Sequence, residues 1–297
     1  MFFSGLSEAI GFGLASGAVL SIGSVGLTVQ FGISGVFNLA YGALLTVSAF
    51  GGYYLVGVGV NFWLAMIIVA VGVGVLSVVI NTSIYAPLQR RGGSPLTLIV
   101  ATLYVATFIQ YTVAAIAGDQ EVSFAPQSGR ELIFLGFHLT ELQVEFIGVA
   151  AVLMFGYHIL LSRSTLGRAL RATAGNRTLA RACGIRTRRV VDFTWLITGM
   201  MCGVAGMALA ATTVAFDFNL GTLFLFYMVA GLLLGGAGHP YGAMIGALTI
   251  GVSSQLAAFY INPELSDVVV FSIMVIILLV RPRGIFAAAA GATGLES

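Results

Sequence analysis

The sequence predicts an all-α integral membrane protein, a polytopic bundle of eight or nine transmembrane helices. Hydrophobic residues make up 59% of the chain and charged residues only 8%, and the mean hydropathy is +1.03. A soluble domain carries about 25% charged residues, so this composition cannot cover a water-exposed surface. The apolar runs also lack the alternation of apolar and polar residues that a membrane β-strand requires. The spanning elements are therefore expected to be helices.

A helix needs about 20 apolar residues to cross a hydrocarbon core of about 30 Å. Nine segments have this character, and they cover residues 9–31, 36–56, 62–86, 95–117, 142–161, 190–213, 223–237, 241–260 and 267–280. The seventh segment is short, and the second is rich in glycine and polar groups. Eight crossings with one broken or re-entrant segment therefore fit the sequence almost as well. In either arrangement, residues 1–297 form a single transmembrane domain.

The distribution of arginine predicts the orientation, because cytoplasmic loops of membrane proteins carry an excess of Lys and Arg. Arg90 and Arg91 follow the third segment, and Arg281 and Arg283 follow the ninth. The loop at about 162–189 holds eight of the thirteen basic residues and no Asp or Glu. Acidic residues collect on the alternate connections. We therefore expect an outside N-terminus, a cytoplasmic C-terminus and a cytoplasmic loop after the fifth segment.

Small residues recur at the spacing of one helical turn. The pairs are Gly13 and Gly17, Gly199 and Gly203, and Gly242 and Gly246. Pairs of this kind let helix backbones approach closely in lipid. They predict close static packing, with a moving interface between helices as the alternative.

The residues give no sign of catalysis or metal binding. The chain contains no HExxH, GxSxG or P-loop motif, and Cys183 and Cys202 have no metal-ligand spacing. No charged residue lies in the middle of a predicted span, where proton-driven transporters usually carry one. We expect no catalytic residue, no metal site, and no use of an ion gradient by this chain alone.

Polar residues do recur within three of the predicted spans. The candidates for a solute pathway are Gln30 on the first segment, Asn38 and Tyr41 on the second, and Ser253 and Ser254 on the eighth. Two glycines precede Asn38 and loosen the helix, and freed backbone groups are tolerated there only when they face protein or a watery cavity. A pathway for a neutral solute is favoured near Asn38. Hydrogen bonding that merely holds helices together is the alternative for each residue.

The arginine-rich loop has the pattern of two short amphipathic helices. Asn176 suits the N-cap of the second helix, and Gly184 suits the left-handed position after its end. A membrane anchor is one explanation, since each Arg near anionic lipid contributes about 1 kcal/mol. Anchoring would not need this helical design, so a docking element for a cytoplasmic protein is favoured. Its expected contact residues are Arg168, Leu170, Arg171, Ala172, Leu179, Ala180, Gly184 and Ile185.

Several stretches carry a resemblance to a known family, and they follow its motifs in order over nearly the whole chain. They are "GVFNLAYGALLTVSAFGGY", "RRGGSPLTLIVATLYVATFIQ", "SRSTLGRALRATAGNRTLARACGI", "GLLLGGAGHPYGAMIGALTIG" and "RPRGIF". Together they resemble the inner-membrane permeases of ABC importers for branched-chain amino acids. The chain departs from the family pattern at Tyr41, where His is usual, and at Ala43, where Glu is frequent. His239 and Pro240 replace a common Ser and an apolar residue.

The resemblance implies the membrane-spanning permease subunit of an ATP-driven importer in the bacterial inner membrane. Its solute would be a branched-chain amino acid or a similar small polar molecule, delivered by an extracytoplasmic solute-binding protein. The implied partners are a second homologous permease, two cytoplasmic ABC ATPase subunits and membrane lipid, with no nucleic acid. ATP and Mg²⁺ would bind the ATPases, while this chain binds no cofactor. The loop at 162–189 would couple the ATPases to transport.

Two other classes of protein remain open from the residues alone. A free-standing channel or facilitator for a small neutral solute, such as urea or a short amide, would explain the polar residues and the missing membrane charges. It would not explain the organised arginine-rich loop. A purely structural membrane subunit is the second alternative.

Overall fold

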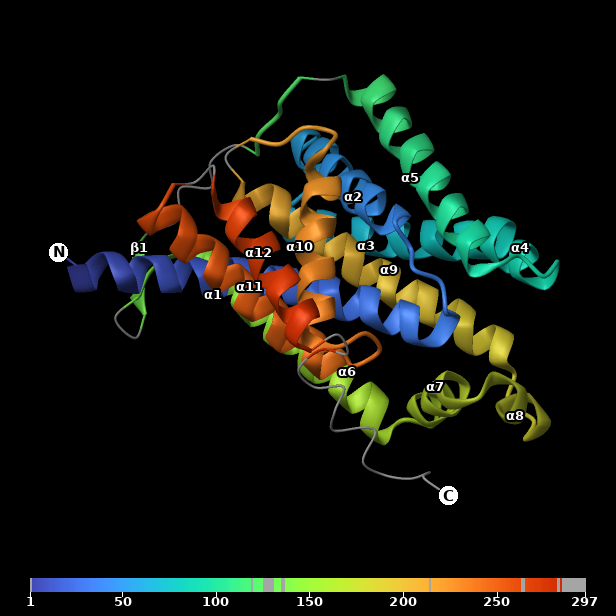
Figure 1. The fold of residues 1–297 in the computed structure, drawn as a ribbon. Coiled ribbons are helices and arrows are strands. Elements are labelled where there is room, and N and C mark those ends of the chain that lie inside the picture. The colour runs from blue at the N-terminus through green and yellow to red at the C-terminus, as the bar shows by residue number, and fades with distance from the viewer. Residues whose placement is uncertain are drawn as a thin grey trace. The chain divides into compact units, whose positions relative to one another are not determined.

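The computed structural model describes residues 2–118, 120–124, 131–134, 137–213, 215–262, 265–281 and 284. Nearly all the regular structure is helical (Figure 1). In chain order the elements are α1 (Phe2–Ser34), α2 (Ala40–Gly57), α3 (Phe62–Ile80), the π-helix η1 (Asn81–Tyr85), α4 (Ala86–Arg90), α5 (Pro95–Ala117), β1 (Glu131–Phe134), β2 (Phe137–Thr140), α6 (Glu141–Arg163), α7 (Thr165–Gly175), α8 (Arg177–Ala182), α9 (Thr187–Thr212), α10 (Leu220–Gly235), α11 (Pro240–Tyr260) and α12 (Ser266–Val280).

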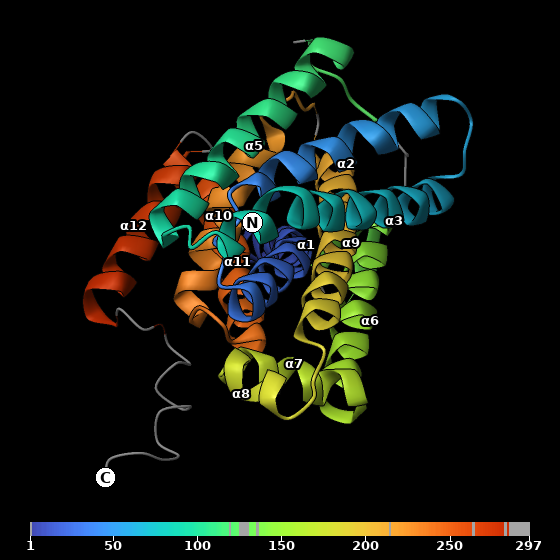
Figure 2. The same ribbon diagram turned by 90° about the vertical axis from the view of Figure 1, so that its right-hand side faces the viewer.

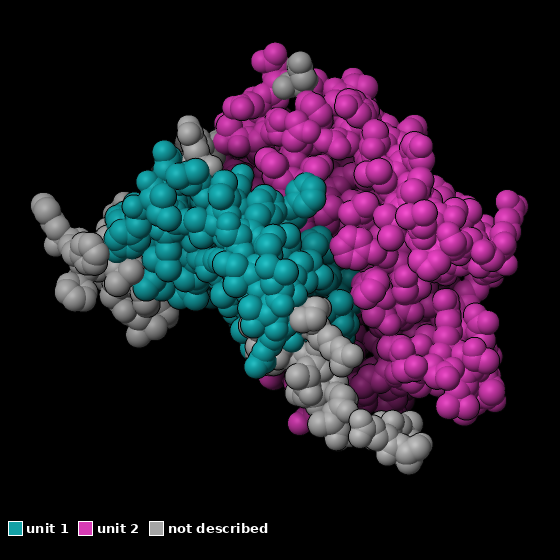
Figure 3. All heavy atoms as spheres, in the orientation of Figure 1, with its two compact units in different colours: residues 1–28, 125–151, 226–297 teal, residues 29–124, 152–225 magenta. Residues whose placement is uncertain are grey.

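The chain folds into two compact units, each built from separate stretches of sequence (Figure 3). Unit 1 comprises residues 1–28, 125–151 and 226–297, and unit 2 comprises residues 29–124 and 152–225. The helices α2 to α5 and α7 to α9 lie wholly within unit 2, whereas α1, α6 and α10 contribute to both units. Unit 2 therefore contains most of the residues predicted to have a function.

The predicted spans coincide with helices. Each of the nine apolar segments falls on one of α1, α2, α3, α5, α6, α9, α10, α11 and α12. Among the described residues, six helices are long and apolar enough to cross a membrane, with α3 to α4 counted as one, and α10 and α12 are shorter apolar helices. The predicted class, an all-α polytopic membrane protein, is confirmed. Whether eight or nine segments cross stays a prediction.

The third predicted span differs from a single regular helix. It is regular only as far as Ile80, and a π-helical turn then covers residues 81–85 before α4 begins. The N–H of Ala86 donates to the carbonyl of Asn81, five residues earlier. Pro87, in the first turn of α4, has no N–H, and its ring crowds the carbonyl four residues before it. The wider π turn accommodates this crowding.

In unit 2 the helices α2, α3 and α9 pack against one another (Figure 2). They approach closely because small residues lie at their contacts. A Cβ atom added to Gly203 of α9 would lie 2.6 Å from the Cα atom of Ala70 in α3. One added to Gly199 would lie 2.9 Å from the Cα atom of Gly74. The hydroxyl of Ser48 in α2 donates to the carbonyl of Gly203. The predicted close approach at Gly199 and Gly203 is confirmed.

The helices of unit 1 also approach closely at glycine residues. Cβ atoms added to Gly13 and Gly17 of α1 would lie 2.7 Å from the Cα atom of Val252 and 3.0 Å from that of Leu248. Gly242 and Gly246 of α11 likewise meet the backbone of α10, at Gly235 and Gly231. Ser21 and Ser24 donate at 3.1 Å to the carbonyls of Met244 and Met228. Both predicted glycine pairs are confirmed as packing contacts, and these two serines hold helices together.

We expect Gly203→Ala to lower the melting temperature of the protein. The new methyl group would enter a space already filled by Ala70, and overpacking of this kind typically costs about 1–3 kcal/mol. Gly72→Ala is the matched control, since Gly72 lies on exposed α3 surface with no atom within 4 Å of an added Cβ. That change should preserve or raise the melting temperature, because Ala is favoured over Gly by about 0.5–1 kcal/mol within a helix. Thermal unfolding of the two detergent-purified variants separates them, and equal melting temperatures would contradict the packing.

Candidate functional site

A short stretch of non-helical backbone separates α1 from α2. Helix α1 ends at Ser34, Gly35 has a left-handed φ of +68°, and residues 35–38 have no regular structure. The two glycines expected to loosen the helix before Asn38 are Gly32 and Gly35; the break occurs at Gly35 as predicted, while Gly32 remains helical. The side-chain oxygen of Asn38 accepts from the N–H of Ala40 at 3.1 Å and so caps the start of α2. In a membrane such backbone must be enclosed by protein or line a polar cavity.

Asn38 belongs to a closed ring of buried contacts within unit 2. Its side-chain oxygen accepts from the Tyr85 hydroxyl at 3.4 Å, and the Tyr85 ring lies 5.4 Å from the Trp195 ring, centroid to centroid. Trp195 is followed one turn later on α9 by Thr198, whose carbonyl accepts from the Tyr41 hydroxyl at 3.2 Å. The N–H of Tyr41 then donates to the Asn38 carbonyl at 3.2 Å. We call these five residues, each at most 1% exposed, the polar ring.

Several buried polar atoms in unit 2 have no hydrogen-bond partner among the described residues. In the polar ring these are Nδ2 of Asn38 and Nε1 of Trp195. Outside it, both amide atoms of Gln30 and the hydroxyl of Ser77 are in the same state. A buried polar group without a partner costs about 1–3 kcal/mol. Unpartnered buried donors and acceptors of this kind make these residues the candidates for solute binding in unit 2.

The predicted pathway residues divide between the two units. Gln30, Asn38 and Tyr41 are fully buried in unit 2. Ser253 and Ser254 lie on α11 in unit 1, where the Ser254 hydroxyl donates to the Gly251 carbonyl of its own helix at 3.0 Å. The hydroxyl of Ser254 is thus already satisfied. A pathway role for either serine stays a prediction.

Sequence reasoning missed Tyr85 and Trp195 as members of the ring. They lie 110 positions apart, and only the packing of η1 against α9 joins them. One signal was available, because a Trp within an apolar span needs a partner for its N–H group. Tyr85 also falls in "NTSIYAPLQR", an unusually polar end for a membrane helix.

The arginine-rich loop folds as the sequence predicts, into the two short helices α7 and α8. Asn176 caps α8, since its side-chain oxygen accepts from the N–H groups of Thr178 at 3.0 Å and Leu179 at 2.9 Å. Gly184 has a φ of +82°, and its N–H donates to the Arg181 carbonyl at 3.0 Å. This confirms the predicted cap and the predicted left-handed glycine.

The end of α8 is a complete Schellman motif. The N–H of Ile185 donates to the carbonyl of Ala180, five residues earlier, at 3.0 Å. This bond encloses the bond from Gly184 to Arg181, which spans only three residues, and the two together make the motif. At the other end of the loop, α7 abuts the end of α6, because a Cβ on Gly167 would collide with the carbonyl oxygens of Leu160 and Leu161. The loop is therefore an ordered element fixed at both ends.

Burial divides the eight predicted coupling residues. Leu170 is 3% exposed and Ala180 is 4% exposed, so both pack inside the chain. Leu179 is 61% exposed, and Ile185 is half-buried. The other residues with exposed side chains or surfaces are Arg168, Arg171, Ala172 and Gly184. Arg171 also donates to the Leu161 carbonyl at the end of α6.

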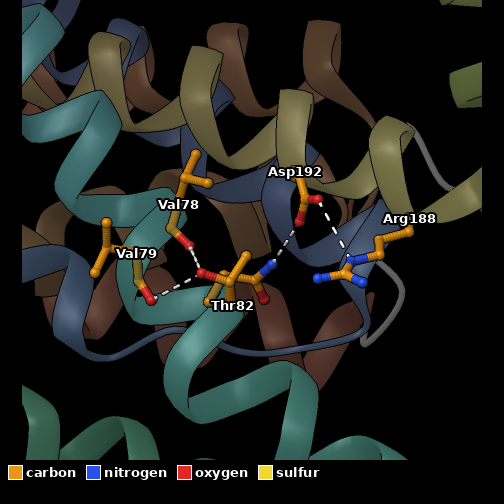
Figure 4. A network of polar contacts seen from close by, with 6 residues as sticks. Val78, Val79, Thr82, Arg188 and Asp192 are labelled. Atoms are coloured by element: carbon orange, nitrogen blue, oxygen red, sulfur yellow. Dashed lines mark hydrogen bonds and ion pairs between the residues drawn. The ribbon is translucent and has the colours of Figure 1, made fainter.

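The π turn connects to the start of α9 through a polar network (Figure 4). The amide nitrogen of Asn81 donates to the Asp192 carboxylate at 3.4 Å, and Nε of Arg188 lies 4.0 Å from the same carboxylate. The hydroxyl of Thr82 in η1 donates back to the last turn of α3, to the carbonyls of Val78 at 2.9 Å and Val79 at 3.2 Å. One end of η1 thus meets α9 at Asp192, and its other end meets the polar ring at Tyr85.

These features define a multi-pass helical membrane protein with an enclosed polar centre and an ordered basic loop. The model of the family described as "Branched-chain amino acid transport system / permease component" matches residues 9–278, and the chain belongs to this family. The predicted identity as a branched-chain amino acid ABC permease is therefore confirmed. The family is one of transport permease subunits and not of enzymes.

Individual relatives agree with the family match. LivH of Escherichia coli K12, a high-affinity branched-chain amino acid transport system permease protein, is 27% identical, with 92% of each chain covered. BraD of Pseudomonas aeruginosa PAO1, of the same description, is 26% identical over 92% of this chain and 93% of its own. The solved structure of PsaBC from Streptococcus pneumoniae in complex with Fab is similar with a TM-score of 0.47 at 15% identity, over 95% of this chain and 92% of that one.

Proposed function

We propose that this chain is the membrane-spanning permease subunit of an ATP-driven importer in the bacterial inner membrane. Its solute is a branched-chain amino acid or a similar small polar molecule, received from an extracytoplasmic binding protein. The observation that carries the proposal is the polar ring with its unpaired donors beside non-helical backbone. Membership of the permease family supports it.

The chemistry around the polar ring suits a zwitterion with an apolar side chain. Asn38 and Trp195 supply N–H groups for a carboxylate, and elsewhere in unit 2 the buried Gln30 amide has both a free donor and a free acceptor. A hydrogen bond to a charged group contributes about 1.5–3 kcal/mol. Neutral donors and acceptors bind such a solute and release it again more readily than a fixed buried charge would. Tyr41 shapes the site, since its hydroxyl is already engaged by Thr198.

The loop of α7 and α8 is the coupling element in this proposal. Its exposed residues, such as Leu179 and Arg168, contact a cytoplasmic ATPase, while Leu170 and Ala180 fix the loop against its own chain. Movement of the loop reaches the polar ring through η1, which is bonded to α9 at one end and to Asn38 at the other. π-helical turns are frequent at functional sites, and this one joins the two parts of the mechanism.

The remaining parts of the transporter are separate subunits. A second homologous permease completes the translocation path, and two ABC ATPase subunits bind ATP and Mg²⁺. A free-standing facilitator for urea or a short amide would need none of these. The capped and anchored architecture of the loop favours the importer, because a facilitator has no use for an ordered basic element of this kind.

Copurification tests the proposal. The tagged chain, expressed with its neighbouring genes, should retain an ATPase subunit through detergent extraction and size-exclusion chromatography. The added binding protein with bound solute should stimulate ATP hydrolysis by the complex. A chain that purifies alone and transports without ATPase subunits would instead be a facilitator.

A further inference from the structure

A cavity of about 240 Å³ lies within unit 2, between the α8 end of the loop and the η1–α4 segment. Four arginines line it, namely Arg90 of α4, Arg177 and Arg181 of α8, and Arg188 of α9. Asp192 is the single acidic residue in its wall. Neither the polar ring nor the exposed face of the coupling loop includes this cavity.

The charges in the cavity do not balance. Asp192 is engaged by Arg188 at 4.0 Å and by the Asn81 amide at 3.4 Å. Among the described residues this is the only ion pair, so Arg90, Arg177 and Arg181 face the cavity with no carboxylate partner. Three unmatched guanidinium groups around one small space repel each other unless an anion lies between them.

Of the three unmatched arginines, Arg177 is the one whose guanidinium is partly buried. Its Nε atom is buried and has no hydrogen-bond partner among the described residues. Burial lowers the pKa of the Arg177 guanidinium, and the neighbouring charge of Arg181 lowers it further. Arg181 is held in place by a bond from its own Nε to the Thr187 hydroxyl at 2.9 Å. The protein therefore keeps a partly buried guanidinium, that of Arg177, close to the like charge of the exposed Arg181.

We propose that this cavity binds an oxyanion of the phosphate class. Planar guanidinium groups match phosphate oxygens in bidentate pairs, and a phosphate offers up to two charges and several acceptor oxygens to three arginines. One carboxylate from a partner protein would leave two of the three unmatched. A bound phosphate bridges α8 to α4 and α9, and it holds the loop in its coupling position. The phosphate group belongs either to an anionic phospholipid or to a free phosphate in the cytoplasm.

The test uses the purified full-length chain in nanodiscs without ATPase or solute, so a negative result leaves the transport proposal intact. In one arm the nanodiscs contain only phosphatidylcholine, and inorganic phosphate is titrated at constant ionic strength. In the other arm phosphatidylglycerol replaces part of the lipid and no phosphate is added. The rise in melting temperature reports binding in both arms, because a ligand of the folded state stabilises it.

We expect saturable stabilisation in at least one arm, and the responding arm identifies the source of the phosphate group. Arg177→Gln with Arg181→Gln should raise the half-saturating concentration about tenfold or more, as expected for lost charge-assisted bonds. Arg177→Lys keeps the charge but loses the planar fork, and it should weaken binding less. Arg168→Gln with Arg189→Gln is the control. Both residues are exposed and lie outside the cavity, and the two substitutions remove the same amount of positive charge.

Three results would overturn the proposal. One is the absence of saturable stabilisation in both arms. Another is equal weakening in the cavity pair and the control pair, which would indicate a diffuse field of positive charge. The third would come from an additional arm with a purified ATPase subunit: stabilisation seen in that arm alone, and abolished by the cavity pair, would make the cavity a protein-docking site.

Discussion

Asn38→Leu is expected to reduce solute uptake roughly 10- to 100-fold or more. The change removes the unpaired Nδ2 donor and the oxygen that accepts from Tyr85 and Ala40, while leucine has a similar size. One lost bond to a charged solute group costs about 1.5–3 kcal/mol, and each 1.4 kcal/mol is tenfold in affinity. Uptake of radiolabelled leucine, normalised to the amount of assembled complex, measures the effect.

Asn61→Leu is a closely matched control for this prediction. Asn61 also caps a helix, since its side-chain oxygen accepts from the N–H of Trp63 at 3.0 Å, but it is exposed at the start of α3. Loss of an N-cap costs about 0.5–2 kcal/mol of stability, so both variants should melt somewhat lower. Only Asn38→Leu should lose uptake. Wild-type uptake by Asn38→Leu would mean that the polar ring is ordinary packing.

Gly184→Val is expected to uncouple ATP hydrolysis from transport. A β-branched residue is a strong outlier at the φ of +82° that Gly184 adopts, so the Schellman motif at the end of α8 should break. The exposed contacts of the loop would then lose their geometry. The complex should still receive solute from its binding protein, but that delivery should no longer stimulate ATP hydrolysis, and uptake should fall to background.

Gly175→Val provides the comparison for the coupling loop. Gly175 ends α7 with no positive φ and no atom within 4 Å of an added Cβ, so valine fits there without strain. Its ATPase stimulation should stay near the wild-type level.

Arg168→Ala with Arg171→Ala should weaken ATPase association only modestly, because exposed ion pairs contribute about 0–1 kcal/mol each. Intact stimulation in Gly184→Val would reduce the loop to a membrane anchor.

Features that depend on local sequence could be predicted well. Each of the nine apolar runs falls on a helix, because in lipid the backbone of a spanning segment must bond within itself. The glycine pairs predicted close helix contacts, and Gly203 and Gly13 meet neighbouring backbone as expected. Asn176 and Gly184 predicted the ends of α8, because capping depends on a few adjacent residues.

Features that depend on tertiary packing could not be predicted in the same way. The π turn follows from how Pro87 and its neighbours fit, and a hydropathy pattern does not register one extra residue in a turn. Tyr85 and Trp195 meet only in the fold. Leu170 and Ala180 carry the small and apolar character of a docking surface, yet they are buried against their own chain. Composition alone does not distinguish these two uses of an apolar side chain.

Uptake by proteoliposomes tests the central claim most directly. The copurified complex is reconstituted with ATP enclosed and with the binding protein and radiolabelled leucine outside. The proposed importer should accumulate leucine above its external concentration, and accumulation should stop when either ATP or the binding protein is omitted. Leucine that only equilibrates across the membrane, at the same rate without ATP and without the binding protein, would contradict an ATP-driven importer.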